Sequence, residues 1–267
     1  MAGESPLPSW EHLVGARHSL RRQACAGEVP PGSDPGHHDS WGIGWFDDAG
    51  QLSLLRQTGS ARDSAYFVFA SEAARRSAAG SGPASVLIGH LRKASVGAVT
   101  GENAHPIRID PREGEGSDPL LLAHNGTILE PLLQALRADL RASGRSEASA
   151  DNDTVVLAAW LFERIAKSKK ERCEALAEAL EELLAGGGYT AINLLVAFPG
   201  ALWALRCFSK NAEYYTLWRR PLDASGGWLV ASERTDDAPG WELLEPGRLM
   251  ELTGSGKFYD VGRRQKL

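Results

Sequence analysis

The chain contains 267 residues, of which 43% are hydrophobic and 24% are charged, and its net charge is −5. This composition is typical of a globular protein, and the length is sufficient to bury a core in one large domain or two small ones. Because acidic residues outnumber basic ones and no long basic run occurs, nucleic acids and anionic membranes are poor candidates as partners.

Cysteine usage and hydropathy indicate the compartment. Three cysteines, Cys25, Cys173 and Cys207, are too few and too scattered for a disulfide framework or a zinc site. A reducing cytoplasm is the simplest environment for such usage. No stretch approaches the length of about 18 apolar residues that a membrane helix needs, and no signal peptide is evident at Met1. We expect a soluble cytoplasmic protein.

Hydrophobic periodicity and breaker residues predict helices and strands along the whole chain. From the N-terminus, the expected elements are a helix over Ser9–Ala24, strands over Trp41–Phe46 and Leu52–Gln57, a helix over Ser64–Ala79, strands over Val86–Ile88 and Leu120–Ala123, helices over Leu129–Arg141, Asp153–Ala166 and Lys170–Leu184, and strands over Ala191–Phe198, Leu202–Cys207, Tyr214–Trp218, Gly227–Ser232 and Arg248–Leu252. Strands at both ends and helices in the middle favour an α+β fold over alternating βαβ units. No linker or internal repeat divides the chain, so we expect a single domain over residues 1–267.

The polar residues that follow two apolar runs are the most informative part of the sequence. The run Val86–Ile88 leads into Arg92, and the run Leu120–Ala123 leads into Asn125 and Gly126. Arginine can bind a carboxylate through two parallel hydrogen bonds, and an asparagine amide beside a glycine N–H can stabilise an oxyanion. On these residues alone, an ordinary ion pair and an Asn-Gly turn are the simpler interpretations.

Seven short segments, in order along the chain, carry a resemblance to a known family. They are Asp39–Trp45, Gly89–Gly97, Glu102–Pro106, Ala123–Ile128, Asp151–Thr154, Leu202–Leu205 and Val230–Asp236. These segments resemble the class II glutamine amidotransferases, which are hydrolases with a nucleophilic cysteine at the mature N-terminus. The resemblance implies a four-layer αββα sandwich, in which two antiparallel sheets lie between helical layers. It also implies a glutaminase-type active site that uses no cofactor.

The resemblance assigns one loop to the substrate's carboxylate. Arg92 would bind the α-carboxylate, and Ser95 and Gly97 would line the same loop. Many relatives have tryptophan after the arginine and histidine before the glycine, where this chain has Lys93 and Val96. These differences can alter which γ-glutamyl compound fits.

Three further residues complete the implied site. Asn125 and Gly126 would form the oxyanion hole, and Asp153 would receive the α-ammonium group. An aspartate at the start of an apolar helix is also a common N-cap or first-turn residue. On the sequence alone, that structural role of Asp153 is the simpler interpretation.

Histidines are frequent around these motifs. His90, His105 and His124 do not have the spacing of metal ligands. We therefore expect them to make structural hydrogen bonds, and we expect no metal site.

The nucleophile and the first strand that bears it do not appear at the N-terminus, where Met1 is followed by Ala2. One explanation is that Met1 is internal and that a short strand beginning with cysteine precedes it. This explanation leaves the rest of the site complete, so we rank it first. A second explanation is that the protein has lost its nucleophile. A third is that processing exposes Cys25, but Cys25 follows the helix that relatives place after the nucleophile.

The sequence thus predicts hydrolysis of a γ-glutamyl amide, either glutamine or a γ-glutamyl small molecule, to glutamate plus ammonia or an amine. In this mechanism the α-amino group of the N-terminal cysteine serves as general base for its thiol. Transfer of ammonia would need a separate synthetase as partner, whereas plain hydrolysis needs none. The alternative is a catalytically inactive family member that binds glutamine or regulates a partner.

Overall fold

The structure is a computed structural model, and it describes residues 1, 8–29, 34–76, 84–94, 97–222, 227–253 and 256–262. Its strands are β1 (Ser40–Asp47), β2 (Leu52–Thr58), β3 (Ala84–Arg92), β4 (Ile107–Ile109), β5 (Leu120–Asn125), β6 (Asn193–Phe198), β7 (Ala201–Leu205), β8 (Trp218–Leu222), β9 (Gly227–Ala231), β10 (Glu242–Leu243), β11 (Arg248–Glu251) and β12 (Phe258–Asp260). Its helices are α1 (Leu20–Ala26), α2 (Ala65–Arg76), α3 (Leu132–Ala142), α4 (Asp153–Lys167) and α5 (Arg172–Ala185), with short helical turns at Glu11–Gly15 and Ser146–Ser149. Within these ranges, no helix has both the length and the apolar character needed to cross a membrane.

The named strands pair antiparallel in every case and form two layers of sheet. One layer is a six-stranded sheet with the order β12-β11-β7-β6-β5-β4. The other layer contains two three-stranded parts, β2-β1-β3 and β10-β8-β9. The β1–β2 hairpin and the β6–β7 hairpin lie where alternating apolar residues flank short turns, as expected from the sequence.

The two layers of sheet face each other across an apolar core. Phe46 and Ile88 from the first three-stranded part and Val230 from the second pack with Leu121 and Ala204 of the six-stranded sheet. Residues of both parts therefore cover the same face of the six-stranded sheet. Alternation of side chains along each strand allows one face of a sheet to be buried in this way.

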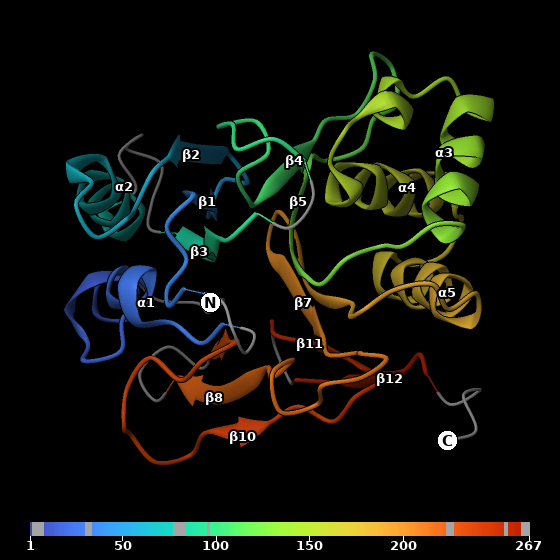
Figure 1. Cartoon of the computed structure of the whole chain (residues 1–267). Helices are drawn as coiled ribbons and strands as arrows, with labels where there is room; N and C mark the ends of the chain where they lie inside the picture. Colours follow the sequence, from blue (N-terminus) through green and yellow to red (C-terminus); the bar gives the residue numbers. More distant parts are fainter. Residues whose placement is uncertain are drawn as a thin grey trace.

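Helices cover the outer faces of both layers, as Figure 1 shows: α1 and α2 lie beside β1–β3, and α3, α4 and α5 lie against the six-stranded sheet. On the first side, Phe67 of α2 packs its ring edge-on against Trp41 of β1, with ring centroids 5.2 Å apart. On the other side, Leu157 and Leu180 are fully buried in a second apolar cluster with strand residues. The order helix, sheet, sheet, helix confirms the four-layer αββα sandwich.

Two expected elements are wrong in detail. The single helix expected over Ser9–Ala24 is interrupted after Gly15, and α1 begins only at Leu20. The strand expected over Tyr214–Trp218 begins only at its last residue, because the two tyrosines form a turn in which both N–H groups donate to Asn211 O at 3.0 Å. The other expected helices and strands are present with shifted ends, and the C-terminal end of the helix expected over 64–79 lies outside the described residues.

Candidate functional site

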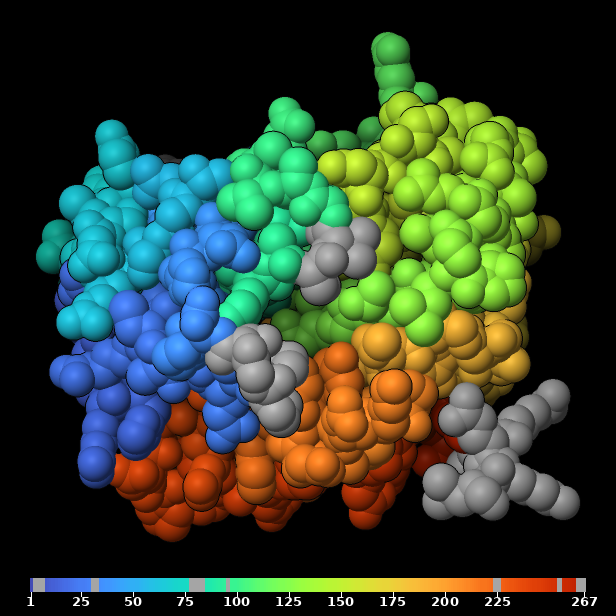
Figure 2. Space-filling model, in the orientation of Figure 1, coloured from blue at the N-terminus to red at the C-terminus, as the bar shows by residue number. Residues whose placement is uncertain are grey.

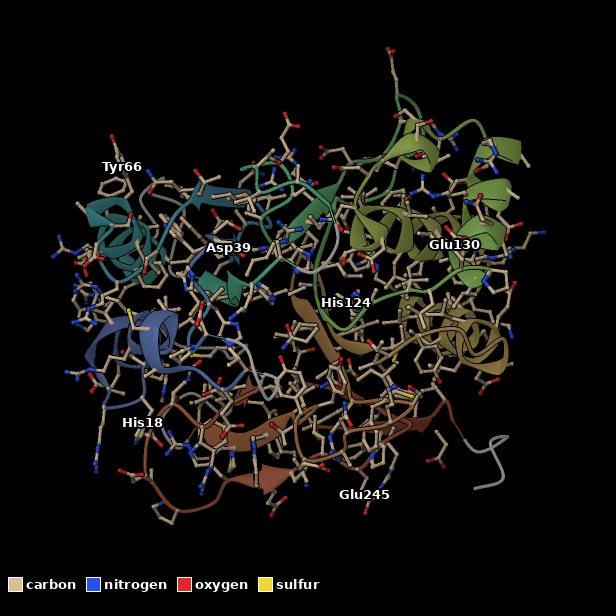
Figure 3. All side chains as sticks on the ribbon, in the orientation of Figure 1. His18, Asp39, Tyr66, His124, Glu130 and Glu245 are labelled. Carbon is tan, nitrogen blue, oxygen red and sulfur yellow. The ribbon has the colours of Figure 1, made fainter. Side chains whose placement is uncertain are left out.

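A cavity of about 360 Å³ lies where the ends of β3 and β5 meet the start of α4 and the segment before β8. Its lining includes Arg92 from β3, Asn125 from β5, Asp153 from α4 and Tyr215 from the segment before β8. His124, which also lines the cavity, lies near the centre of the molecule in Figure 3. In Figure 2 the blue-to-teal part, the green part and the orange part of the chain come together near the middle of the face that is shown. The fold thus brings together segments that are far apart in the sequence.

The floor of the cavity is formed by the end of β5. Asn125 lies opposite Asn193 of β6, and its Oδ1 is 3.1 Å from His90 Nε2. An amide oxygen can only accept a hydrogen bond, so His90 donates, and the Asn125 NH₂ group is turned away from the imidazole. Gly126 follows with a φ of 140°, and a Cβ at this position would lie 2.0 Å from Ala191 O. Only glycine fits here, and its N–H lies next to the asparagine amide.

Three closely packed histidines support this floor. The rings of His90 and His105 have centroids 4.5 Å apart. His124 donates through Nε2 to Ala191 O at 3.0 Å, and its Nδ1 accepts from the Thr154 hydroxyl at 3.1 Å. Burial is the largest cause that lowers the pKa of all three, to about 4 for His90. The histidines are therefore neutral near pH 7 and make structural hydrogen bonds, as expected from the sequence.

Acidic and sulfur-containing side chains could also contribute to a metal site together with histidines. Across the described ranges, no group of three histidine, cysteine, aspartate or glutamate side chains is placed to hold a metal ion.

Arg92 is the last residue of β3, and only 5% of it is exposed. Its Nη1 donates to Ala98 O at 3.1 Å. Burial lowers the pKa of the guanidinium, and the carboxylates of Asp39, Asp153 and Asp151 counteract this shift. Because arginine keeps its proton in proteins, Arg92 places a positive charge on one wall of the cavity.

Asp153 is the first residue of α4, with 5% of it exposed, but it is not the N-cap. Asn152 has that role, because its side-chain oxygen accepts from Thr154 N at 2.8 Å. Asp153 Oδ2 accepts from Ile128 N at 2.7 Å, which ties the start of α4 to the segment after β5. Its Oδ1 accepts from Thr154 N at 2.9 Å. Since an ionised carboxylate has about four acceptor positions, this side chain can also accept from an ammonium group.

The remaining two residues of the implied site, Ser95 and Gly97, follow Arg92 in the sequence. Gly97 has a φ of 77° and lies beside the start of α4, where a Cβ would be 3.4 Å from Asn152 Cα, and it does not line the cavity. The next residue is held by Asp151, whose Oδ2 accepts from Ala98 N at 3.1 Å. Ser95 lies outside the described residues.

The opposite end of the cavity contains residues that sequence reasoning did not single out. Tyr214, Tyr215, Thr190 and Glu233 all line it. Thr190 Oγ1 accepts from Thr127 N at 3.0 Å and from the Tyr215 hydroxyl at 3.2 Å, so this end is joined to the residue after Gly126. The segment containing Glu233 carried part of the family resemblance, but nothing in the sequence indicated that the adjacent tyrosines face the same space.

A second, narrower cavity of about 100 Å³ lies between β3 and β9 and reaches from Asn125 to Met1. The Met1 amino group donates to Leu87 O at 2.7 Å, and Leu87 N donates to Met1 O at 2.8 Å. Burial lowers the pKa of this amino group to about 5. All three cysteines are among the described residues, and none of them lines either cavity.

Comparisons with known proteins show the family to which the chain belongs. The family model for class II glutamine amidotransferases matches residues 30–223. Amidophosphoribosyltransferase of Mycobacterium tuberculosis is 30% identical over 187 residues, which cover 64% of this chain and 31% of that protein. The corresponding protein of Mycobacterium leprae is 32% identical over 187 residues, covering 64% of this chain and 29% of its own length. The chain thus spans about a third of the length of these relatives.

Solved structures share the fold at lower identity. Glutamine phosphoribosylpyrophosphate amidotransferase from B. subtilis aligns with a TM-score of 0.62 and 18% identity, covering 98% of this chain and 48% of that chain. A glutamine aminotransferase class-II domain protein from Silicibacter pomeroyi aligns with a TM-score of 0.57 and 18% identity, covering 85% of this chain and 97% of that one. Almost the whole of the second protein is therefore covered by the shared fold.

Proposed function

Because this chain belongs to the class II glutamine amidotransferase family, we propose that its central cavity binds a γ-glutamyl amide and that the protein hydrolyses it to glutamate plus ammonia or an amine. One observation carries the proposal. A buried cation, Arg92, and a buried carboxylate, Asp153, line the same cavity as Asn125 and Gly126. An α-amino acid presents a carboxylate and an ammonium group, so these two side chains match its charges.

In this proposal each polar group has one role. Arg92 binds the α-carboxylate through its guanidinium fork, and Asp153 accepts hydrogen bonds from the α-ammonium group. Ser95 and Gly97 shape the loop that follows Arg92. The positive φ of Gly97 supports this assignment, because it lets the loop turn back toward Asn152 at the start of α4.

The oxyanion of the tetrahedral intermediate is assigned to the Asn125 side-chain NH₂ and the Gly126 N–H. The hydrogen bond from His90 to Asn125 Oδ1 supports this, because it fixes the orientation of the amide before substrate binds. Loss of one such preorganised donor typically lowers the rate by about 100- to 1,000-fold. Neither group needs a metal or a cofactor for this role.

The nucleophile is assigned to a cysteine thiol on a strand that precedes Met1. Met1 and Leu87 form a hydrogen-bonded antiparallel pair, so preceding residues would continue along the edge of β3 toward Arg92. In that register, a residue five positions before Met1 lies opposite Arg92, which is five positions after Leu87. Within the described part of the chain, the backbone groups of Gly89 and Leu91 make no backbone hydrogen bond on this edge.

The narrow cavity supports the same assignment. It lies between the edges of β3 and β9, the two edges that a strand inserted at this position would join. A peptide N–H in place of the Met1 amino group would make the same hydrogen bond to Leu87 O without burying an ionisable group. A strand inserted here would begin beside Asn125, where the thiol of its first residue is needed, and would run from there to Met1.

The chemistry that follows is nucleophilic catalysis in two steps. The α-amino group of the cysteine takes the thiol proton, and the sulfur attacks the side-chain amide carbon of the substrate. The C–N bond then breaks, and the proton leaves with the ammonia or amine. Water hydrolyses the resulting thioester to glutamate and restores the thiol. If the ammonia is used for a synthesis, a separate synthetase must receive it from this cavity.

The test begins with the protein isolated from its native source. Mass spectrometry identifies its N-terminal peptide, and the same preparation is incubated with L-glutamine while glutamate and ammonia are measured. Because a residue five positions before Met1 would lie opposite Arg92, we expect a terminal cysteine roughly four to six residues before Met1. Glutamate release should require that cysteine, so replacing it with serine, or starting the chain at Met1, should abolish release.

Two results would contradict this proposal. A native terminus at Met1 or Ala2 with no glutamate release would remove hydrolysis, and retained glutamine binding would then favour the inactive, glutamine-binding alternative. Release that survives alkylation by an electrophilic glutamine analogue would exclude an N-terminal thiol as the nucleophile.

A further inference from the structure

The cavity extends beyond the groups that a glutamine molecule needs. Its volume of about 360 Å³ falls within the range of roughly 300–1,000 Å³ that is usual for ligands of drug size. From Gly126 the lining continues through Thr127 and Thr190 to Tyr215. In Figure 1, β8, which follows Tyr215 in the chain, lies in the lower part of the view, whereas α4, which begins with Asp153, lies in the upper part. The cavity therefore has a separate end with its own chemistry.

Two aromatic rings form part of that end. Tyr214 and Tyr215 lie edge to face, with ring centroids 4.9 Å apart and an interplanar angle of 68°. Both residues are partly buried and line the cavity. The hydroxyl of Tyr215 is held by Thr190, so its ring is fixed in place. Fixed aromatic faces of this kind bind apolar and cationic groups.

Carboxylates lie beside these rings. Glu233 lines the cavity, and its side chain is 20% exposed. Its Oε1 accepts from Glu28 N at 2.9 Å, which fixes the carboxylate without neutralising it. Burial raises the pKa of Tyr214, and the neighbouring Tyr215, Glu233 and Glu28 raise it further. Negative charge is thus concentrated around the Tyr214 ring.

Two basic side chains of the cavity lining, Lys93 and His37, lie near this charge. Lys93 donates its ammonium group to Asp34 O, on the loop before β1. His37 Nε2 lies 3.8 Å from Glu233 Oε1, which is too long for a hydrogen bond but close enough for an ion pair when the imidazole carries a second proton. In the described part of the chain, Glu233 Oε2 makes no hydrogen bond, so one carboxylate oxygen remains available to a ligand.

We propose that this second wall, formed by Tyr214, Tyr215 and Glu233, binds the leaving amine of the substrate and that this amine carries a positive charge. The inference rests on the proposed function, because it assigns the part of the γ-glutamyl amide beyond the scissile bond. A cationic group is attracted by an aromatic face and by a carboxylate at once, whereas a neutral group lacks the charge-dependent part of both attractions and an anionic group is repelled. Free glutamine, whose leaving group is ammonia, would leave this wall without a ligand.

The experiment compares three ligands that differ only beyond the amide. They are the γ-L-glutamyl amides of 1,2-diaminoethane, propylamine and glycine, which are cationic, neutral and anionic at that end. Binding to the 267-residue chain is measured by calorimetry, with L-glutamine as the reference ligand. We expect the cationic amide to bind about tenfold more tightly than the neutral one, in line with a partly desolvated cation–π contact plus a carboxylate. The anionic amide should bind most weakly.

Variants assign the preference to the wall. Glu233→Gln keeps the shape and the acceptor for Glu28 N but removes the charge, so it should reduce the ratio of cationic to neutral affinity at least severalfold. Tyr214→Leu should also reduce this ratio, and it provides a second test if the first variant folds poorly. Glu213→Gln is the matched control, because Glu213 is exposed and does not line the cavity. It should leave the ratio unchanged.

The outcomes separate this inference from the proposed function. Glutamine binding together with equal affinities for all three amides would overturn the inference and leave the proposed function standing. Tightest binding of the anionic amide would also overturn it and would assign the wall to Lys93 and His37. If neither glutamine nor any amide binds, the proposed function fails and the inference fails with it.

Discussion

His90 Nε2 donates a hydrogen bond to Asn125 Oδ1 over 3.1 Å, which joins the ends of β3 and β5 beneath the cavity. The other imidazole nitrogen, Nδ1, is buried and has no hydrogen-bond partner among the described residues. Burial lowers the pKa of His90 to about 4, so the ring is neutral and its single proton is committed to Asn125. His90 is therefore a positioning residue for the proposed oxyanion hole.

Replacing His90 with phenylalanine keeps a ring of similar size but removes the donor to Asn125. We expect kcat for glutamine hydrolysis by the native form to fall by about 10- to 100-fold, because the asparagine amide loses its fixed orientation. The KM for glutamine should change little. His90→Gln retains an N–H donor and should recover part of the rate. Equal losses in both variants, or a change confined to KM, would argue against positioning.

Arg92→Ala removes the proposed carboxylate contact. Glutamine affinity measured by calorimetry should fall by at least about tenfold, because a charge-assisted, bidentate contact is lost. Arg92→Lys keeps the charge without the planar fork and should give an intermediate affinity. Arg108→Ala is the matched control, since Arg108 is an exposed strand residue that pairs with Asp110. Unchanged binding in a folded Arg92→Ala variant would remove Arg92 from the site.

Gly126→Ala should destabilise the fold strongly. The new Cβ would lie 2.0 Å from Ala191 O at a φ of 140°, so the backbone between β5 and β6 must move. We expect a loss of at least about 3 kcal/mol in the free energy of unfolding, measured with urea. Gly144→Ala introduces a Cβ at a φ of 74° into open space and should cost only about 1 kcal/mol. Similar losses in the two variants would contradict the steric argument.

Stability should decrease as the pH falls through the range in which the unfolded chain binds protons that the folded chain does not. Burial lowers the pKa of His12 to about 4 in the folded protein, whereas an unperturbed histidine has a pKa of about 6.5. Between these values the unfolded state binds more protons, so the free energy of unfolding should fall by up to about 1.4 kcal/mol per pH unit for this residue.

The difference between the chain and its His12→Gln variant isolates this effect. The free energy of unfolding is measured with urea between pH 7 and pH 4. It should fall less steeply in the variant, and the difference between the two slopes should correspond to at most one bound proton. The hydrogen bond between His12 Nδ1 and Thr235 Oγ1 is also changed in the variant, but that change is already present at pH 7, so the slope between pH 7 and pH 4 isolates the proton. Identical pH slopes would show that His12 takes up its proton in the folded state.

The residues at the ends of β3 and β5 could be identified from the sequence, because a short apolar run followed by a polar residue predicts where a buried strand ends. This local pattern placed Arg92 and Asn125 at strand ends, and the structure brings both to one cavity. The alternation and breaker residues also predicted the β1–β2 and β6–β7 hairpins. The family and the αββα layers could also be predicted from the sequence, because the short motifs and their order along the chain can be read without knowledge of contacts between distant segments.

Contacts between distant segments decided the rest. Tyr214 and Tyr215 were expected in a strand, because aromatic residues favour strands, but a turn held by Asn211 directs them toward the cavity. The hydrogen bond between His90 and Asn125 depends on the packing of two sheets, which local sequence does not encode.

The edge of β3 and the pairing of Met1 with Leu87 likewise exist only after the sheets have assembled. Local sequence thus determined which residues end strands and begin helices, through propensity and periodicity. Tertiary structure alone determined which of those ends share a cavity and which sheet edge faces it, because side chains from non-adjacent segments meet only when the layers pack.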